Sequence, residues 1–117
     1  MEVQAITHNI RMSAQKMREV VRQIQGLPAA HAVAVLAVVP RKGARVVAKT
    51  LKSAMANAED LKMHKDEYRE MDTENLRVKS AVAGAATTIK RFTPKARRSA
   101  GPILNRNCHV KIVLSED

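Results

Sequence analysis

The 117-residue sequence has little of several residue types on which common functions depend. Cys108 is its one cysteine, which excludes an internal disulfide and suits a reducing compartment. Tyr68 and Phe92 are the only aromatic residues, which argues against successive bases stacking on aromatic side chains. No apolar run approaches the roughly 18 residues of a membrane span, and the first residues lack the features of a signal peptide. We therefore expect a cytoplasmic protein without membrane contact.

Acidic side chains are absent from residues 77–111, although this stretch holds nine of the 21 lysines and arginines. Residues 1–76 are nearly balanced, with twelve bases and nine acids, so most of the net charge of +10 lies in the stretch. A charge run is often only a solvated loop, but this density without acids favours a nucleic acid as partner. The nine cations are Arg77, Lys79, Lys90, Arg91, Lys95, Arg97, Arg98, Arg106 and Lys111.

Apolar and small residues alternate on both sides of the densest part of this stretch. The first set is Leu76, Val78, Ser80 and Val82, and the second is Cys108, Val110, Ile112 and Leu114. A period of two is typical of strands, so the pattern predicts two strand arms joined by a basic loop. Arms of about fourteen residues at roughly 3.3 Å each would reach on the order of 45 Å. Because a two-stranded hairpin is marginal alone in water, we expect a bound polyanion to complete it.

The remaining chain predicts one further strand and three helices. A short strand is expected from Glu2 to Met12, followed by a helix with Ser13 as its N-cap that is closed by Gly26. A short buried helix is expected over residues 28–39. The clearest helical spacing follows Pro40, and the mixed charges of residues 62–75 suggest an exposed connection. The apolar face of this main helix would comprise Ala44, Val47, Ala48, Leu51, Ala54, Met55 and Ala58.

The fold class that follows is α+β, with three helices packed on a small antiparallel sheet and a long protruding β-hairpin. We expect a single domain over residues 1–117. Its globular body would span about 1–78 and 106–117, and the extended basic hairpin about 79–105.

Residues with catalytic or metal-binding chemistry do not cluster in the sequence. The four histidines (His8, His31, His64 and His109) are scattered, and neither zinc spacing nor a phosphate-binding glycine loop is present. Cys108 and His109 are neighbours on a predicted strand, so they would point to opposite faces. We expect no enzyme and no cofactor or metal, with Cys108 as a small core residue and His31 satisfied or half-exposed.

The main helix also carries a basic face. Arg45, Lys49 and Lys52 recur at the spacing that points away from the predicted core. Such a face is often simply solvated, but beside an acid-free hairpin it could equally contact phosphates. The sequence leaves these two interpretations open.

Four segments resemble the ribosomal protein L22 family of the bacterial large subunit. They are Arg-Met-Ser-Ala-Gln-Lys-Met-Arg at 11–18, Leu-Lys-Ser-Ala-Met-Ala-Asn-Ala-Glu at 51–59, Lys-Arg-Phe-Thr-Pro-Lys-Ala-Arg at 90–97 and His-Val-Lys-Ile-Val at 109–113. The resemblance implies a body seated on large-subunit rRNA near the exit of the nascent-chain tunnel. It also implies that the hairpin reaches inward, so that its tip forms part of the tunnel wall near the macrolide-binding site.

Carried over by motif, the tunnel-facing tip would be Ile89, Lys90 and Arg91. The partners so implied are rRNA, neighbouring ribosomal proteins, the nascent polypeptide and, near the tip, macrolide antibiotics. The expected rRNA-binding residues are Arg11, Lys16 and Arg18 near the N-terminus, and Lys90, Arg91, Lys95, Arg97, Arg98 and Arg106 in the hairpin.

The sequence thus predicts a structural constituent of the large ribosomal subunit that binds rRNA, supports subunit assembly and lines the peptide exit tunnel. The alternative is a free nucleic-acid-binding architectural protein or RNA chaperone that places the basic ribbon in a groove. A role on a membrane surface ranks third, because the basic region lacks the apolar face that it would require.

Overall fold

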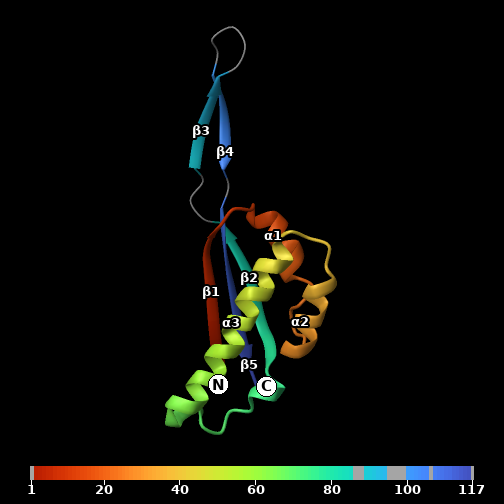
Figure 1. Cartoon of the computed structure of the whole chain (residues 1–117), viewed down its shortest axis with the longest axis vertical. Helices are drawn as coiled ribbons and strands as arrows, with labels where there is room; N and C mark the ends of the chain where they lie inside the picture. The colour runs from red at the N-terminus through yellow and green to blue at the C-terminus, as the bar shows by residue number, and fades with distance from the viewer. Residues whose placement is uncertain (1, 86–88, 95–99, 106, 117) are drawn as a thin grey trace.

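A computed structural model describes residues 2–85, 89–94, 100–105 and 107–116 of the chain. Three helices lie on one face of a three-stranded antiparallel sheet, which confirms the α+β prediction (Figure 1). The elements in chain order are β1 (Glu2–Ile10), α1 (Ala14–Val21), α2 (Ala29–Val38), α3 (Gly43–His64), the short 3-10 turns η1 (Asp66–Tyr68) and η2 (Thr73–Asn75), β2 (Arg77–Ala85), β3 (Ile89–Pro94), β4 (Ala100–Asn105) and β5 (Cys108–Ser115).

The strands form two separate sheets, one of three strands and one of two. In the larger sheet the order is β1-β5-β2, so the last strand of the chain lies between the other two, and Ile112 is opposite both Ala5 and Ala81. Strands β3 and β4 pair only with each other and extend beyond this sheet (Figure 1). The molecule is accordingly long and narrow, measuring 67 × 28 × 16 Å. We call the three-stranded sheet with its helices the body, and β3–β4 the hairpin.

Helix α1 begins where the sequence predicts and ends earlier than expected. The Ser13 hydroxyl accepts a hydrogen bond from the Lys16 backbone N–H at 3.4 Å, so Ser13 is the N-cap. The helix closes at Val21, and the chain then turns through Gly26, which has a φ of +77°. Ile24 lies in this turn and is nevertheless fully buried, because the turn packs onto the sheet. Met17, Val20 and Val21 of the helix are buried as well, so its apolar face continues through Ile24 into the turn.

Helix α3 is the longest element and carries the predicted apolar face. Val47, Leu51 and Ala54 are completely buried, at the spacing of one helical stripe. The helix begins close to α1, since a Cβ added to Gly43 would lie only 3.0 Å from Met17 Sδ. It continues to His64, so the predicted connection over residues 62–75 begins inside the helix. That connection is also not wholly exposed, because Met71 is fully buried between its two 3-10 turns.

Strand β2 departs from simple alternation. The register shifts between Val78 and Ser80, where Lys79 is inserted as a bulge opposite Leu114 and Val113. Beyond the bulge Ala81 and Ala83 face the core, whereas Val82 is 53% exposed. The alternating set that begins at Leu76 therefore does not keep to one face as far as Val82, because one extra residue moves all later side chains to the other face. Strand β2 also pairs with β5 as far as Ala85, so the body extends past the expected boundary near residue 78.

The outer edge of β2 is covered by the segment that joins α1 to α2. Backbone hydrogen bonds link Gly26 N–H to the Val78 carbonyl (2.9 Å), Val78 N–H to the Leu27 carbonyl (2.9 Å) and Ala29 N–H to the Leu76 carbonyl (2.8 Å). An uncovered edge strand would offer these groups to another chain. The short buried helix expected at residues 28–39 is confirmed as α2, and its first turn helps to close this edge.

The core lies between the helices and the inner face of the sheet. Cys108, Val110, Ile112 and Leu114 of the central strand are all fully buried, as the alternation predicted. Cys108 is a free thiol in this core, which confirms its expected role as a small core residue. The body therefore places a continuous apolar layer behind β5, and its charged residues remain on the outside.

Candidate nucleic-acid interface

The hairpin leaves the body at a specific junction. Ile10 of β1 and Ala85 of β2 are both opposite Cys108, the first residue of β5. The β1 register shifts between Thr7 and Ile10, and Asn9 there adopts a φ of +54°, which Asn tolerates better than most residues. Strand β1 thus ends beside the base of the hairpin, and Arg11 follows it directly.

A histidine fixes the irregular end of β1. The Asn9 backbone N–H donates a hydrogen bond to His109 Nδ1 at 3.0 Å. Because Nδ1 is the acceptor, the N–H of the neutral imidazole is at Nε2. The His8 ring packs edge-on against His109, with 5.0 Å between the ring centroids. No local pattern in the sequence predicts this contact, because it joins residues about 100 positions apart; the tolerance of Asn for positive φ is the one local signal at this site.

The three predicted cations near the N-terminus, Arg11, Lys16 and Arg18, are all exposed on the short stretch after this junction. Arg18 also has a structural contact, since its Nε donates to the Ala83 carbonyl at 3.1 Å. Gln25 caps the same strand edge by donating to the Ala81 carbonyl at 2.8 Å. Arg18 therefore holds α1 against β2. Lys16 lies two residues earlier in the helix, and its ammonium has no ion-pair partner among the described residues.

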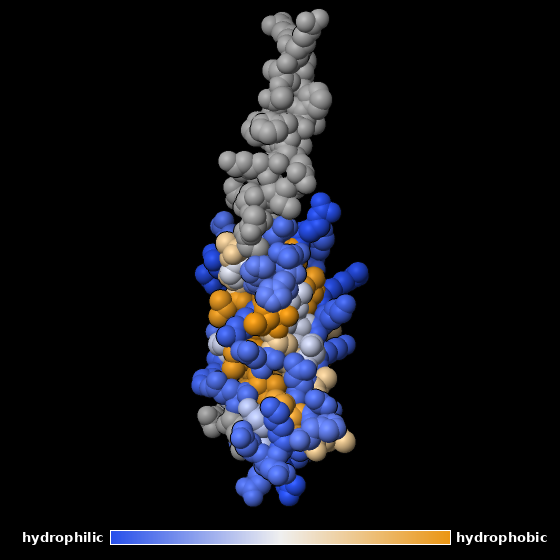
Figure 2. Space-filling view, turned by 90° about the vertical axis from the view of Figure 1, so that its left-hand side faces the viewer, coloured by the Kyte–Doolittle hydropathy of each residue, from blue (hydrophilic) through white to orange (hydrophobic). Residues whose placement is uncertain are grey.

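The hairpin cations are placed in part. Lys90 and Arg91 lie in β3, opposite Leu104 and Ile103 of β4. Lys95, Arg97, Arg98 and Arg106 lie outside the described residues. Figure 2 shows one flank of the molecule, where hydrophilic residues adjoin the base of the hairpin and hydrophobic ones gather lower on the body.

The position expected for the hairpin tip needs a correction. Ile89 pairs with Asn105, and the ladder continues through four further pairs to Pro94 opposite Ala100. Ile89, Lys90 and Arg91 therefore belong to the end of the ladder nearest the body, and Pro94 with Ala100 is the described pair at its far end. The motif and an arm of about fourteen residues placed the tip near residue 90, whereas β3 continues through Phe92 to Pro94.

The basic face of α3 is exposed as predicted. Arg45, Lys49 and Lys52 all lie on the outside of the helix, and none takes part in an ion pair among the described residues. Arg41, just before the helix, is 3.7 Å from Glu19, but both side chains are more than half exposed, so this pair contributes little to stability. The face is thus available for an anionic partner.

Two groups have shifted pKa values for ordinary structural reasons. A hydrogen bond and the charge from Lys79 lower the pKa of Glu2, whose carboxylate accepts from the Lys79 ammonium across the sheet. Burial raises the pKa of the Cys108 thiol, which keeps it neutral. Neither arrangement resembles a proton-transfer site.

Within residues 2–85, 89–94, 100–105 and 107–116, no three His, Cys, Asp or Glu side chains gather closely enough to hold a metal ion. None of the helices in those ranges is both long and apolar enough to cross a membrane. The exposed cations beside the extended ladder are features of a protein that binds nucleic acid.

Comparison with known proteins narrows this class. The family model described as ribosomal protein L22p/L17e matches residues 5–115. The large ribosomal subunit protein uL22 of Opitutus terrae is 45% identical over 116 residues, which cover 99% of this chain and 96% of the relative. Its counterpart in Akkermansia muciniphila is 40% identical over 116 residues (99% and 97%), and that of Latilactobacillus sakei is 44% identical over 108 residues (92% and 86%).

The chain therefore belongs to the ribosomal protein L22 family. This membership confirms the predicted family and the predicted role as a structural, non-enzymatic constituent of the large ribosomal subunit. Its partners are accordingly rRNA and other ribosomal proteins.

Proposed function

We propose that the chain supports large-subunit assembly by binding rRNA phosphates along its hairpin and along the adjoining stretch that contains Arg11, Lys16 and Arg18. The observation that carries this proposal is the acid-free run of nine cations over residues 77–111, which includes both hairpin strands. A two-stranded ladder outside the body has no core to stabilise it, and neutralisation of its cations by phosphates would supply the missing stability.

Salt dependence tests this proposal on the isolated protein and an rRNA fragment. If about six hairpin cations meet phosphates, the slope of log K against log salt should be about −4 to −5, at roughly 0.7 to 0.9 per contact. Replacing Lys95, Arg97 and Arg98 together by Ala should flatten the slope by about two to three. A slope near zero for the unaltered chain would overturn the proposal.

The chain offers a matched control for this charge variant. Lys62, Lys65 and Arg69 also carry three positive charges, but they lie at or beyond the C-terminal end of α3, at the opposite end of the molecule from the hairpin (Figure 1). Their joint replacement by Ala removes the same charge. The slope should then stay within about one of the unaltered value. If the slope flattened equally in both variants, binding would depend on the net charge of the protein and not on the cations of the hairpin.

We further propose that the hairpin lines the nascent-chain tunnel, and that its far end lies near bound macrolides. Support comes from the family resemblance of residues 90–97 and from the narrow extended shape, since a slender ladder can enter a passage that would exclude the body. The correction to the tip moves the expected tunnel-facing end from Ile89, Lys90 and Arg91 to the other end of the ladder, where Pro94 pairs with Ala100.

Shortening the hairpin tests this placement in cells. A variant in which Asn-Gly replaces residues 95–99 should still enter large subunits but change macrolide sensitivity, because a two-residue turn can join Pro94 to Ala100. The variant with Ala at Lys95, Arg97 and Arg98 keeps the hairpin length and controls for lost charge. If both variants alter drug response equally, charge rather than reach is responsible, and an unchanged response in the shortened variant would refute tunnel placement.

A further inference from the structure

Helix α2 has an unusual composition for a helix at the surface. Its ten residues, Ala29 to Val38, include no charged side chain, and His31 is the only polar one. A helix that is apolar all round is ordinarily buried all round. In α2 one side packs into the core through Ala29, Ala32 and Leu36. The other side is open: Ala30, His31, Ala34, Ala37 and Val38 are exposed, Val38 at 79%.

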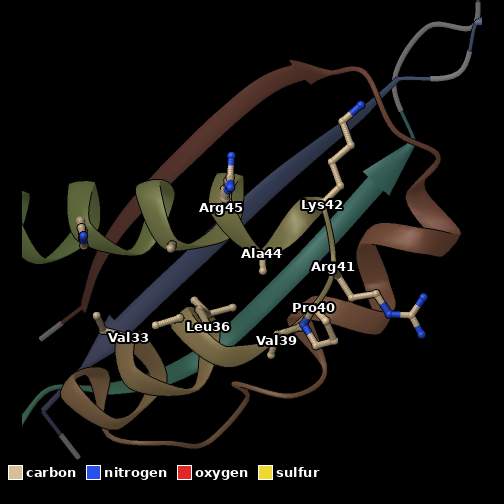
Figure 3. A pocket seen from close by; sticks show the side chains of 11 residues that line it. Val33, Leu36, Val39, Pro40, Arg41, Lys42, Ala44 and Arg45 are labelled. Atoms are coloured by element: carbon tan, nitrogen blue, oxygen red, sulfur yellow. The ribbon is translucent and has the colours of Figure 1, made fainter.

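A groove of about 590 Å³ lies between α2 and α3 and adjoins this open side at Ala37 (Figure 3). Its floor is apolar and its rim is cationic, with no acidic side chain among the described residues that line it. Figure 3 shows Val33, Leu36 and Val39 along the α2 side, with Lys42 and Arg45 projecting from the α3 side. Lys52 adds a third cation along the same rim.

The rim cations differ in their availability. Arg41 points away from the floor in Figure 3 and lies 3.7 Å from Glu19 of α1. Lys42, Arg45 and Lys52 are exposed and form no ion pair among the described residues. The groove therefore presents three available positive charges along one side of an apolar channel.

We propose that the α2–α3 groove is the docking surface for a segment of a neighbouring protein that carries aliphatic side chains flanked by Asp or Glu. Carboxylates would pair with the rim, and aliphatic side chains would cover the floor and the open side of α2. The inference rests on membership of the large subunit, which supplies protein neighbours, and not on the proposed hairpin contacts.

The apolar side of the groove favours a protein over RNA as occupant. An RNA backbone would satisfy the three cations, since phosphates dominate such contacts. It would leave the uncharged helix without a matching surface, whereas aliphatic side chains gain from removing apolar area from water. Charge complementarity to the rim then selects an acidic segment over a neutral one.

Cross-linking in purified large subunits tests the class of the occupant. A diazirine-bearing amino acid in place of Ala37, which lines the groove, should form an adduct on irradiation whose mass ribonuclease does not change. Mass spectrometry should place the cross-link in a segment with aliphatic residues beside Asp or Glu. The same probe at Ala56, exposed on α3 but outside the groove, should not label that segment.

A binding assay with single-substitution variants of the full chain tests the role of the rim cations. The probe is a synthetic peptide spanning the cross-linked segment. Arg45→Glu should raise its Kd by at least tenfold. Lys49→Glu is the matched control, because Lys49 is exposed on the same helix but does not line the groove, and its Kd should change less than twofold.

Each alternative result is decisive. An RNA adduct at Ala37 would show that the groove binds rRNA. If subunits that contain the labelled protein gave no adduct, the groove would be open to solvent. Each of these two results would overturn the proposal. Equal effects of Arg45→Glu and Lys49→Glu would also overturn it. The salt slope of the hairpin variants is measured separately, so failure here leaves the rRNA proposal intact.

Discussion

The body and the hairpin use the same antiparallel pairing under very different conditions. In the body, β5 pairs on both sides and buries Val110, Ile112 and Leu114 beneath three helices. In the hairpin, β3 and β4 pair only with each other. Residues 1–76, most of the body, are also nearly balanced in charge, whereas the hairpin region has no acid. Stability from internal packing therefore belongs to the body, and the hairpin depends on an external anionic partner.

Amide hydrogen exchange should give the largest difference between the two regions. In the free protein, amides of β3 and β4 should exchange on the order of 10³-fold faster than those of β5 and the middle of α3, because a lone ladder opens locally while the core opens only with global unfolding. Adding the rRNA fragment should slow exchange in the hairpin alone. Equal protection of both regions without RNA would show that the hairpin is self-sufficient.

Truncating a core residue should destabilise the body strongly. Leu51→Ala removes a completely buried side chain from α3 and should lower the free energy of unfolding by about 2–5 kcal/mol. Met63→Ala is the control on the same helix, since Met63 is 80% exposed, and should change it by less than about 0.5 kcal/mol. Urea denaturation measures both. A loss below about 1 kcal/mol for Leu51→Ala would mean that the body is not the main source of stability.

Arg18 and Lys16 should separate structural from RNA-binding roles near the junction. Arg18→Ala removes the hydrogen bond to the Ala83 carbonyl and should cost about 0.5–1.5 kcal/mol of stability. Lys16→Ala removes the same charge without such a bond and should leave stability within about 0.5 kcal/mol. Both should weaken binding to the rRNA fragment. Equal stability of the two variants would show that Arg18 does not hold α1 to β2.

The smallest effect concerns the pH dependence of the pair between Glu2 and Lys79. Because Lys79 lowers the folded-state pKa of Glu2, the pair stabilises the protein above the ordinary Glu pKa of about 4.5, and this contribution is lost as the pH falls through the folded-state value. Carboxyl chemical shifts in an NMR titration should give a lower Glu2 pKa than in Lys79→Ala. An unchanged pKa in that variant would remove Lys79 as the cause.

Local chemistry in the sequence was sufficient for most of the fold. Ser13 can cap a helix from its own side chain, and the stripe through Val47, Leu51 and Ala54 fixes the buried face of α3 without further information. The alternation from Cys108 to Leu114 likewise predicted the central strand. In each case the pattern lies within one segment of the chain, so the structure of that segment can be predicted without knowing which other segments it contacts.

The errors occurred where distant residues decide the outcome. Met71 is buried because the 3-10 turns on both sides of it pack against α3, which no charge pattern over residues 62–75 reveals. Val82 faces outward because the register with β5 slips at Lys79. The tip was misplaced because neither the motif nor the assumed arm length shows that Lys90 and Arg91 pair with β4 and that β3 continues to Pro94. The available face of α3 was correctly predicted, but the open side of α2 required the structure.

The central position of β5 also sets the order in which the sheet can form during synthesis. Strands β1 and β2 have no direct ladder with each other, and both must wait for β5, the last strand along the chain. Helices α1 to α3 can begin to form during synthesis, but their apolar faces have no complete sheet to pack against until β5 has been made. Because Glu2 pairs with Ser115, closure joins residues more than 100 positions apart, a topology that folds slowly and exposes intermediates to aggregation. The newly made chain therefore has a vulnerable interval that ends only when its final strand is inserted between the first and the second.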